Sequence, residues 1–377
     1  FMIADFIIIG SGIAGMSAAY RLSSHGKVVV LDKEAHLGYH TTGRSAAFFT
    51  ENYGNNIIRA LTKASRSFLE KPSECFRKDP LMYLNGGFLM IANADQSEAV
   101  EKELKYALKT SAKVFEISKK EALNMVPAIK ENYINRALHE PYSKVMDVDL
   151  IHQGYARGAK NNDAQIFFNQ EVTKISKINN NWNVKTKNGT FSSPILINAA
   201  GAWCDEIAKL AGCKPLGIKP KRRTVIIFKN ANDYVIDKWP VVIDIEDNFY
   251  FKPEVGNFLA SPADETDSPP CDAQPEEIDI ALTVERLEKA TNLKINNIEH
   301  KWAGLRSFYS DRTPIVGEDT ENSGFYWLAG QGGYGIQTSP SISKILESLI
   351  TGKKWPDKLT ELSINEDTLS PKRFIKN

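Results

Sequence analysis

The fold is decided by one early stretch, residues 6–32, which reads FIIIGSGIAGMSAAYRLSSHGKVVVLD. An apolar, β-branched run at residues 4–9 predicts a buried strand, residues 13–24 predict a helix, and residues 27–31 predict a second strand. Together these elements predict a βαβ unit, in which a glycine-rich turn links the first strand to the helix.

This turn carries Gly10, Gly12 and Gly15 in the spacing GxGxxG. The first glycine allows a tight turn, the second lets the backbone approach a pyrophosphate, and the third allows close packing of helix on strand. A helix N-terminus favours the anion, and Asp32, after the second strand, is placed to accept hydrogen bonds from ribose hydroxyls. The pattern indicates FAD or NAD rather than NADP.

The rest of the chain favours FAD. A simple NAD enzyme would continue with further βα units, whereas residues 37–49 are rich in Gly, Thr and Ser. A second glycine-rich unit comes far down the chain, with a predicted strand at 325–329, a loop at 330–335 and a helix at 340–350. This order suits a cofactor that lies extended between two distant segments.

Other local patterns predict further elements. Helices are expected within residues 97–127, where Ser118 and Glu121 fit a capping box, and at 150–160. Asn188-Gly189 fits a type I′ hairpin turn. The predicted strands cover residues 164–178, 181–186, 190–197, 224–228 and 248–252.

Composition excludes several classes of protein. The 377 residues are 42% hydrophobic and 25% charged with a formal net charge of +1, so no overall field attracts nucleic acid or an anionic membrane. No apolar run is as long as a membrane span and no leader is recognisable, so we expect a cytoplasmic protein, with peripheral membrane association left open. The four cysteines lack CxxC spacing, so we expect neither disulfides nor a metal site.

The motifs resemble those of the D-amino acid oxidase/dehydrogenase family of flavoproteins, over nearly the whole chain. Beyond the first glycine motif and Asp32, the resemblance rests on residues 38–47 (GYHTTGRSAA), 198–203 (NAAGAW), 304–317 and 330–335 (GQGGYG). Within this family, residues 220–223 (PKRR), 302–308 (WAGLRSF) and 331–338 (QGGYGIQT) are similar to those of bacterial D-arginine dehydrogenases.

The resemblance implies an α/β fold with a Rossmann-like FAD-binding domain of the glutathione-reductase type. We expect that domain to comprise residues 1–80, 143–212 and 301–377, and an inserted α+β substrate domain with an antiparallel sheet to comprise 81–142 and 213–300. The implied FAD contacts are Gly10, Gly12, Ile13, Ala14, Gly15, Asp32, Lys33, Thr42, Gly43, Arg44, Ser45, Ala46, Ala47, Val172, Ala200, Gly201, Trp203, Gly304, Arg306, Gly332, Gly333, Tyr334, Gly335, Ile336, Gln337 and Thr338.

The resemblance also implies that FAD is bound without a covalent link. A histidine near His40 carries flavin covalently in some relatives, but the histidine in the most similar ones is unattached. Sarcosine-oxidase-like members use a cysteine after their Gly-x-Arg segment, and none follows Cys271 here. We therefore expect His40 to be a packed or hydrogen-bonded residue.

For the substrate, the resemblance implies an amino acid whose Cα gives a hydride to flavin N5. Arg306 matches the arginine that clamps the carboxylate, Tyr250 matches the tyrosine that shares this task, and Arg222 matches a second basic residue of the pocket. Tyr53 matches an aromatic on a mobile lid that excludes water. The released imino acid hydrolyses to a 2-keto acid and ammonia.

Two departures from the D-arginine dehydrogenases bear on specificity. Phe48 replaces a histidine, and Gly87 falls where a carboxylate pairs with the substrate guanidinium. Because a buried guanidinium without a partner is costly, we expect neutral or apolar D-amino acids, with Phe48 and the space above Gly87 accepting the side chain. Gly333 and Gln337 complete the expected pocket.

Several alternatives remain open at this point. A secondary-amine oxidase acting on glycine or sarcosine would share the fold, FAD and the carboxylate clamp. A flavin-binding subunit without catalytic activity is a second alternative. Whether oxygen, a quinone or another carrier accepts the electrons, and the oligomeric state, are not determined by the sequence.

Overall fold

The computed structural model describes residues 1–77, 79–110 and 113–374. The predicted βαβ unit is present as β2 (Phe6–Ile9), α1 (Ile13–Leu22) and β3 (Val28–Leu31). The two strands are parallel, with Phe6 opposite Val28 and Ile9 opposite Leu31. All eight residues of these strands are buried, which explains their continuous apolar sequence.

The βαβ unit is the centre of a six-stranded sheet. Three further strands join it in parallel, namely β10 (Gln165–Phe167), β14 (Ile195–Asn198) and β22 (Phe325–Ala329). Strand β21 (Ile315–Glu318) adds an antiparallel edge. The sheet brings residues from both ends of the sequence side by side, as expected for a Rossmann-like domain.

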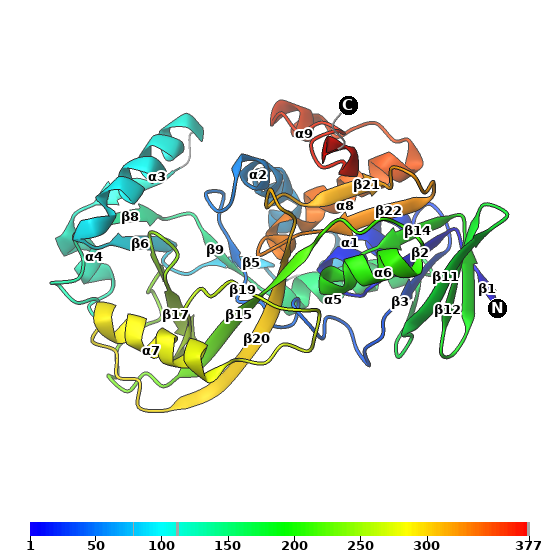
Figure 1. Ribbon diagram of the computed structural model, residues 1–377. Coiled ribbons are helices and arrows are strands. Elements are labelled where there is room, and N and C mark those ends of the chain that lie inside the picture. Colours follow the sequence, from blue (N-terminus) through cyan, green and yellow to red (C-terminus); the bar gives the residue numbers. More distant parts are fainter. Residues whose placement is uncertain (78, 111–112, 375–377) are drawn as a thin grey trace.

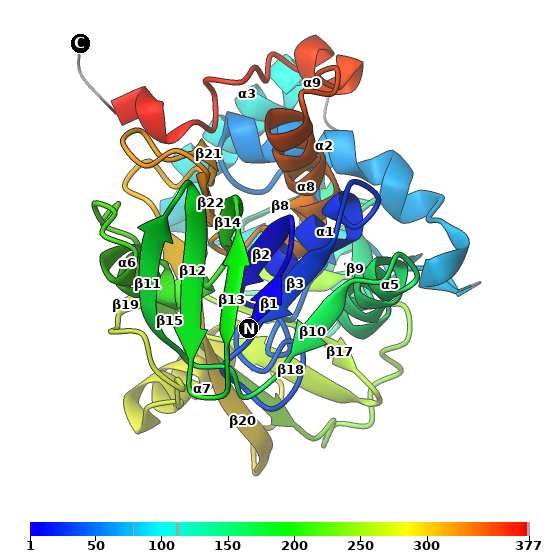
Figure 2. The same ribbon diagram turned by 90° about the vertical axis from the view of Figure 1, so that its right-hand side faces the viewer.

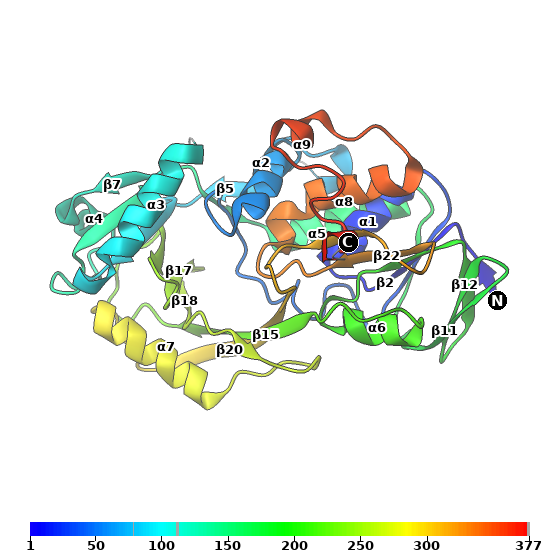
Figure 3. The same ribbon diagram turned by 45° about the horizontal axis from the view of Figure 1, so that its top comes forward.

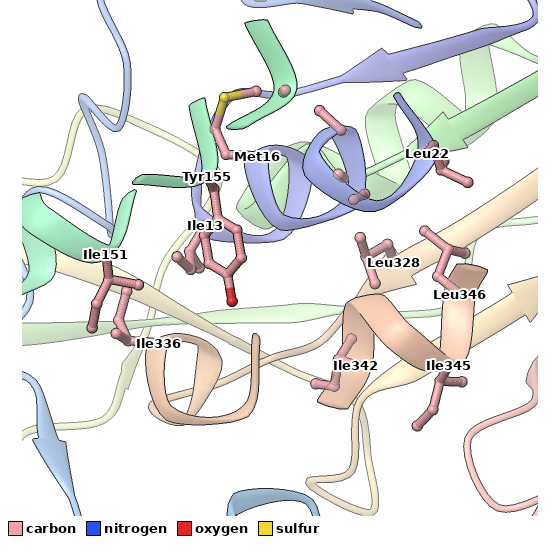
Figure 4. Packing of buried hydrophobic residues seen from close by; sticks show 14 of the residues in the cluster. Ile13, Met16, Leu22, Ile151, Tyr155, Leu328, Ile336, Ile342, Ile345 and Leu346 are labelled. Carbon is pink, nitrogen blue, oxygen red and sulfur yellow. The ribbon is translucent and has the colours of Figure 1, made fainter. Parts of the chain in front are cut away.

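Both faces of this sheet are covered. Helices α1, α5 (Val148–Lys160) and α8 (Gly335–Thr351) pack on one face, where Figure 4 shows Met16, Tyr155 and Ile342 within one apolar cluster. The other face packs against α6 (Cys204–Leu210) and a separate sheet (Figure 2). That sheet contains β1 (Met2–Ile3), β13 (Thr190–Ser193), β12 (Asn181–Thr186) and β11 (Val172–Ile178).

A second, larger sheet lies beside the first (Figure 1). Most neighbours are antiparallel, but β6 and β16 are parallel, so the sheet is mixed. Its strands are β19 (Thr266–Asp267), β15 (Lys219–Phe228), β18 (Asn257–Ser261), β17 (Tyr250–Glu254), β16 (Val241–Asp244), β6 (Phe88–Ala92), β8 (Arg136–Glu140), β7 (Phe115–Ile117) and β20 (Ile298–Phe308).

Helices α4 (Lys119–Met125) and α7 (Glu277–Ala290) cover one face of this sheet (Figure 3). Helix α3 (Ser97–Thr110) packs against side chains of the opposite face. The remaining named elements are β4 (Phe48–Phe49), α2 (Asn56–Glu70), β5 (Met82–Leu84), β9 (Lys144–Met146), α9 (Asp357–Glu361) and four short 3₁₀ turns.

The paired strands β15 and β20 run from one sheet towards the other (Figure 1). The fold class is therefore confirmed, an α/β domain of Rossmann type with a second domain built on a mixed, mainly antiparallel sheet. The residue ranges proposed for the two domains stay a prediction.

Several element boundaries differ from those predicted. Residues 97–127 contain the extra strand β7 between two helices, although the Ser118–Glu121 capping box is confirmed. Residues 164–178 form two strands, separated by a segment in which Asn169 has φ = 54°.

The turns also differ. Asn188-Gly189 lies in the predicted hairpin between β12 and β13, but neither residue has positive φ, so the turn is not type I′. Positive φ at two successive residues of a hairpin occurs instead at Asn179-Asn180, between β11 and β12, at 49° and 62°, and at Val255-Gly256, between β17 and β18, at 47° and 78°.

Helix α8 begins five residues earlier than predicted and contains Pro340. A proline in a helix leaves one carbonyl without its usual N–H donor. Here the Ser339 hydroxyl donates to the Ile336 carbonyl at 2.9 Å and supplies the missing hydrogen bond. The side chain before the proline therefore allows the helix to continue through it.

Candidate dinucleotide and substrate site

The glycine turn after β2 has the geometry that its sequence predicts. Gly10 has φ = +103°, and a Cβ there would lie 2.5 Å from the Ala199 carbonyl oxygen. A Cβ on Gly15 would lie 1.8 Å from the Gly10 carbonyl oxygen. Neither position accepts a larger residue without moving backbone atoms, so both glycines are required by close packing.

Asp32 lies at the end of β3 beside this turn. Its carboxylate accepts hydrogen bonds from the Ser11 amide at 2.7 Å and from the Ser11 hydroxyl at 2.5 Å. The ammonium of Lys33 lies 3.5 Å from the ring centroid of Trp203. These groups form the polar end of a cavity beside the nucleotide-binding strands.

The cavity is continuous from Asp32 to Arg306 and has a volume of about 320 Å³. It runs along the carboxyl ends of the parallel strands, where open α/β sheets bind ligands. The predicted residues that line it are Gly10, Gly12, Ile13, Ala14, Asp32, Lys33, Thr42, Arg44, Ser45, Ala46, Val172, Ala200, Gly201, Trp203, Tyr250, Gly304, Arg306, Gly332, Gly333, Gly335 and Ile336.

Other predicted residues lie behind this lining or away from it, and they are Gly15, Gly43, Ala47, Phe48, Tyr53, Gly87, Arg222, Tyr334, Gln337 and Thr338. Gln337 is 3% exposed and is held by hydrogen bonds to Thr50 and Thr62. Tyr334 is also buried, and burial raises its pKa to about 12. These two side chains support the lining rather than forming it.

His40 lines the cavity and is hydrogen-bonded. Its Nε2 lies 2.7 Å from a Glu34 carboxylate oxygen, and its ring lies 4.6 Å from that of Trp203. Burial, helped by the nearby charges of Lys33 and Arg44, lowers the pKa of His40 despite the neighbouring Glu34, which raises it. The expectation of a packed, hydrogen-bonded histidine agrees with these contacts.

Arg306 lies on β20 at the other end of the cavity. Its Nη1 donates to the Tyr53 hydroxyl at 3.4 Å, and in the described part of the chain no carboxylate forms an ion pair with it. A Cβ on Gly333 would lie 2.9 Å from the same nitrogen, so the glycine lets the guanidinium lie against the loop. An unpaired guanidinium facing a cavity is suited to bind a carboxylate.

Arg222 does not lie in the cavity, contrary to expectation. It is 9% exposed and forms hydrogen-bonded ion pairs with Asp279 and Glu276. Its neighbour Arg223 lines the cavity instead. In the ladder between β15 and β20, Arg222 is opposite Leu305, whereas Arg223 is opposite Gly304 and faces the same side as Arg306.

Arg223 was missed because the two neighbouring arginines are indistinguishable by residue type. The alternation of side chains along a strand decides between them, but only once the register with β20 is known. Arg223 is less available than Arg306, because its guanidinium donates to the Asp264 carbonyl at 2.9 Å and to Glu265 at 3.4 Å. Sequence analysis also missed Ser11, Glu34, Gln170 and Ser307, which line the cavity.

Phe48 packs behind the cavity lining near Tyr250, and its ring centroid lies 6.2 Å from that of Tyr250. The expected space above Gly87 does not exist. Gly87 has φ = +80°, and a Cβ there would lie 2.3 Å from the Glu140 carbonyl oxygen. Backbone atoms of Glu140 and Pro141 fill this space, so a substrate side chain does not enter it.

The fold and the cavity define a two-domain protein with an elongated dinucleotide site that continues to an arginine. Residues 5–349 match the model of a family described as FAD dependent oxidoreductase, named DAO. The chain belongs to this family, and its cofactor is FAD. The protein is therefore an FAD-dependent oxidoreductase.

Two curated relatives illustrate the breadth of the family. Glycerol 3-phosphate dehydrogenase of Caloramator mitchellensis is 25% identical, and the match covers 90% of this chain and 72% of that protein. Mitochondrial dimethylglycine dehydrogenase of Homo sapiens is 23% identical, covering 96% of this chain but only 44% of that protein.

Solved structures share the fold. L-proline dehydrogenase from P. horikoshii has a TM-score of 0.84 at 22% identity, covering 99% of this chain and 98% of that chain. Glycine oxidase from Geobacillus kaustophilus has a TM-score of 0.83 at 20% identity, covering 97% and 99%. None of these named proteins is a D-arginine dehydrogenase.

The residues present fit FAD. Gly12, the N-cap residue of α1, lines the cavity without a side chain and so leaves room for a pyrophosphate at this helix N-terminus, and the Asp32 carboxylate borders the cavity. Gly201, with φ = +55° and no atom within 4 Å of its Cβ position, leaves free space at the cavity wall. Within the described residues there is no group of three or more His, Cys, Asp or Glu side chains arranged to hold a metal, and no helix long and apolar enough to cross a membrane.

Proposed function

We propose that the protein oxidises the Cα–N bond of an amino acid, with the substrate carboxylate bound by Arg306. The observation that carries this proposal is the guanidinium of Arg306, which borders the cavity without an ion-pair partner among the described residues. A planar guanidinium binds a carboxylate through two parallel hydrogen bonds, which would fix the orientation of Cα.

FAD supplies a hydride acceptor for this chemistry when it is bound. The residues of the chain orient the substrate and exclude water. Arg306 holds the carboxylate, Tyr250 borders the same part of the cavity, and Tyr53 covers Arg306 from the side of Tyr334. The imino acid product leaves and hydrolyses to a 2-keto acid and ammonia.

A neutral or apolar side chain suits the wall beside Arg306. Val225 and Tyr250 line the cavity there and belong to one apolar cluster, whose members Phe48 and Leu259 lie behind the lining. The carboxylates among the lining residues are Asp32, Glu34, Glu171 and Glu206, which belong to the part of the cavity around Trp203. None of these lining carboxylates lies on the apolar side of the cavity, which argues against the cationic side chain of D-arginine. The D configuration is proposed from the sequence resemblance alone.

The second candidate is an N-substituted glycine or a cyclic imino acid. Space above Gly87 is filled by backbone, which favours a substrate with a small Cα substituent. The relatives named above include enzymes called dimethylglycine dehydrogenase, glycine oxidase and L-proline dehydrogenase. Both candidates use the same carboxylate clamp.

The test is anaerobic bleaching of the flavin absorption band by a panel of substrates. The panel contains D- and L-amino acids, sarcosine, dimethylglycine, L-proline and glycerol 3-phosphate. Fast bleaching by apolar D-amino acids supports the first candidate, and fast bleaching by sarcosine or proline supports the second. A lead for D-arginine, or bleaching by glycerol 3-phosphate alone, contradicts the proposal. Stopped-flow reoxidation in air then separates an oxidase from a dehydrogenase.

A further inference from the structure

A buried carboxyl group outside the cavity holds the segment that carries two of the predicted pocket residues. Glu140, the last residue of β8, is 6% exposed. The Thr50 hydroxyl lies 2.8 Å and 3.0 Å from its two oxygens. In the described part of the chain no cation pairs with Glu140, which is unusual for a buried acidic residue.

Thr50 follows Phe48-Phe49 and precedes Tyr53, so it is central to the segment on the substrate side of the cavity. The Thr50 amide donates to Gln337 Oε1 at 3.3 Å, and Gln337 Nε2 donates to Thr62 Oγ1 at 2.9 Å. One polar chain therefore connects the larger sheet, through Glu140, to the first turn of α8, through Gln337. That turn directly follows the glycine loop beside Arg306.

Asn52 is the next polar group of this network. Its side chain lies beside the Glu140 carboxyl, and its Oδ1 is buried without a hydrogen-bond donor among the described residues. Burial raises the pKa of Glu140 and the nearby Glu51 raises it further, against hydrogen bonds from Ser143, Thr50 and Asn52 that lower it.

We propose that Glu140 is a positioning residue for substrate binding, whose buried carboxyl group accepts a hydrogen bond from Thr50 and so holds the segment of Phe48 and Tyr53 beside the cavity. Few residues separate this network from Arg306. Tyr53 lies one residue from Asn52 and hydrogen-bonds to Arg306. Loss of the network would leave Arg306 in place but remove the residue that covers it.

This inference rests on the proposed function only for the identity of the substrate. The experiment therefore includes binding of a simple carboxylate, acetate, measured by perturbation of the flavin spectrum in the FAD-loaded protein. For Glu140→Ala we expect the acetate Kd and the amino acid KM to rise about tenfold, with a smaller change in kcat and normal FAD content. Glu140→Gln retains a neutral donor and acceptor, so we expect near-wild-type values.

Thr50→Val serves as the second variant if Glu140→Ala does not fold, and it should weaken acetate binding in the same direction. Glu347→Gln is the matched control, because Glu347 is also buried but pairs with His25 and Lys344 at the other end of α8. We expect that control to change stability and leave the acetate Kd unaltered.

The pH dependence gives a second readout. Because ionisation would leave a buried charge without a cation partner among the described residues, acetate affinity of the wild type should fall as pH rises through the raised pKa of Glu140, and Glu140→Gln should remove this decline. An unchanged acetate Kd in folded Glu140→Ala and Thr50→Val, or a Glu140→Gln variant as defective as Glu140→Ala, overturns the proposal. If acetate binding follows the prediction but no amino acid reduces the flavin, the proposed function fails while the positioning role stands.

Discussion

At the scale of single residues, two arginines predicted for the pocket differ completely in their surroundings. Arg222 is held by two carboxylates on the side of β15 that faces α7, whereas Arg306 borders the cavity with a tyrosine hydroxyl as its partner. A charge that is already paired has little to offer a ligand. A charge without a partner gains the full interaction energy when a ligand of opposite charge binds.

Replacement of Arg306 and of Arg222 by methionine should therefore have opposite consequences. For Arg306→Met we expect kcat/KM for a carboxylate substrate to fall roughly a hundredfold to a thousandfold, with little change in stability. For Arg222→Met we expect a loss of about 3 kcal/mol in unfolding free energy, because Asp279 is left buried without its partner. Steady-state kinetics and urea unfolding of both variants measure this. Equal losses of activity at equal stability would contradict the assignment.

His40 gives a second prediction at this scale. Its Nε2 is engaged by Glu34, so we expect FAD to be bound without a covalent link. Acid precipitation should release the yellow colour into the supernatant, whose flavin should be recovered as intact FAD. A coloured pellet would show a covalent bond instead.

At the scale of elements, the turn from β2 to α1 depends on contacts between backbone atoms. A Cβ on Gly15 would meet the Gly10 carbonyl oxygen at 1.8 Å, and no side-chain rotation relieves this contact. The β-hairpin at Gly189 is the opposite case, because a Cβ there meets only the Phe191 ring, at 3.6 Å.

We therefore expect Gly15→Ala to destabilise the protein by about 3 kcal/mol and to weaken FAD binding, since α1 must move away from β2. The matched Gly189→Ala should behave like the wild type. Thermal unfolding with and without added FAD, together with FAD titration of the apoprotein, tests both expectations. Tight FAD binding by Gly15→Ala would refute the packing argument.

Elements with a local signal were predicted well. The βαβ unit, β22 and the Ser118–Glu121 capping box follow from residue patterns within a few positions of each other. The extra strand β7 was missed, because within the described residues it pairs with β8, about twenty residues away in the chain, and it is largely exposed. The start of α8 was predicted too late because a proline is expected at the beginning of a helix. The Ser339 hydroxyl, which replaces the hydrogen bond that Pro340 cannot donate, meets the Ile336 carbonyl only in the folded helix.

At the scale of the whole molecule, two buried glutamates have pKa values that are shifted in opposite directions from the ordinary value. Burial by itself raises the pKa of Glu347, but hydrogen bonds from Lys344 and His25 outweigh it and lower the pKa from 4.5 to about 2. Burial dominates at Glu140 and raises its pKa. The two groups should therefore give opposite dependences of stability on pH.

Glu347 has the lowered value, so its contribution to stability is present above pH 4.5 and is lost as the pH falls towards 2. We expect Glu347→Gln to be less stable than the wild type at pH 7, with a difference that shrinks below pH 4.5. Denaturant unfolding at a series of pH values measures this. A difference that stays constant from pH 7 to pH 3 would show that the ion pairs contribute nothing.

The sequence by itself determined the FAD-binding fold and the glycines of the nucleotide turn, because those signals are local: apolar runs, glycine spacing and a carboxylate at a strand end. The resemblance of the motifs also predicted that Arg306 and Tyr250 belong to the site, and both line the cavity. Tertiary structure alone decided that Arg223 rather than Arg222 faces the cavity, because the register of β15 on β20 joins segments about eighty residues apart. It also decided that backbone fills the space above Gly87 and that Glu140 meets Thr50, since both depend on the approach of segments distant in sequence.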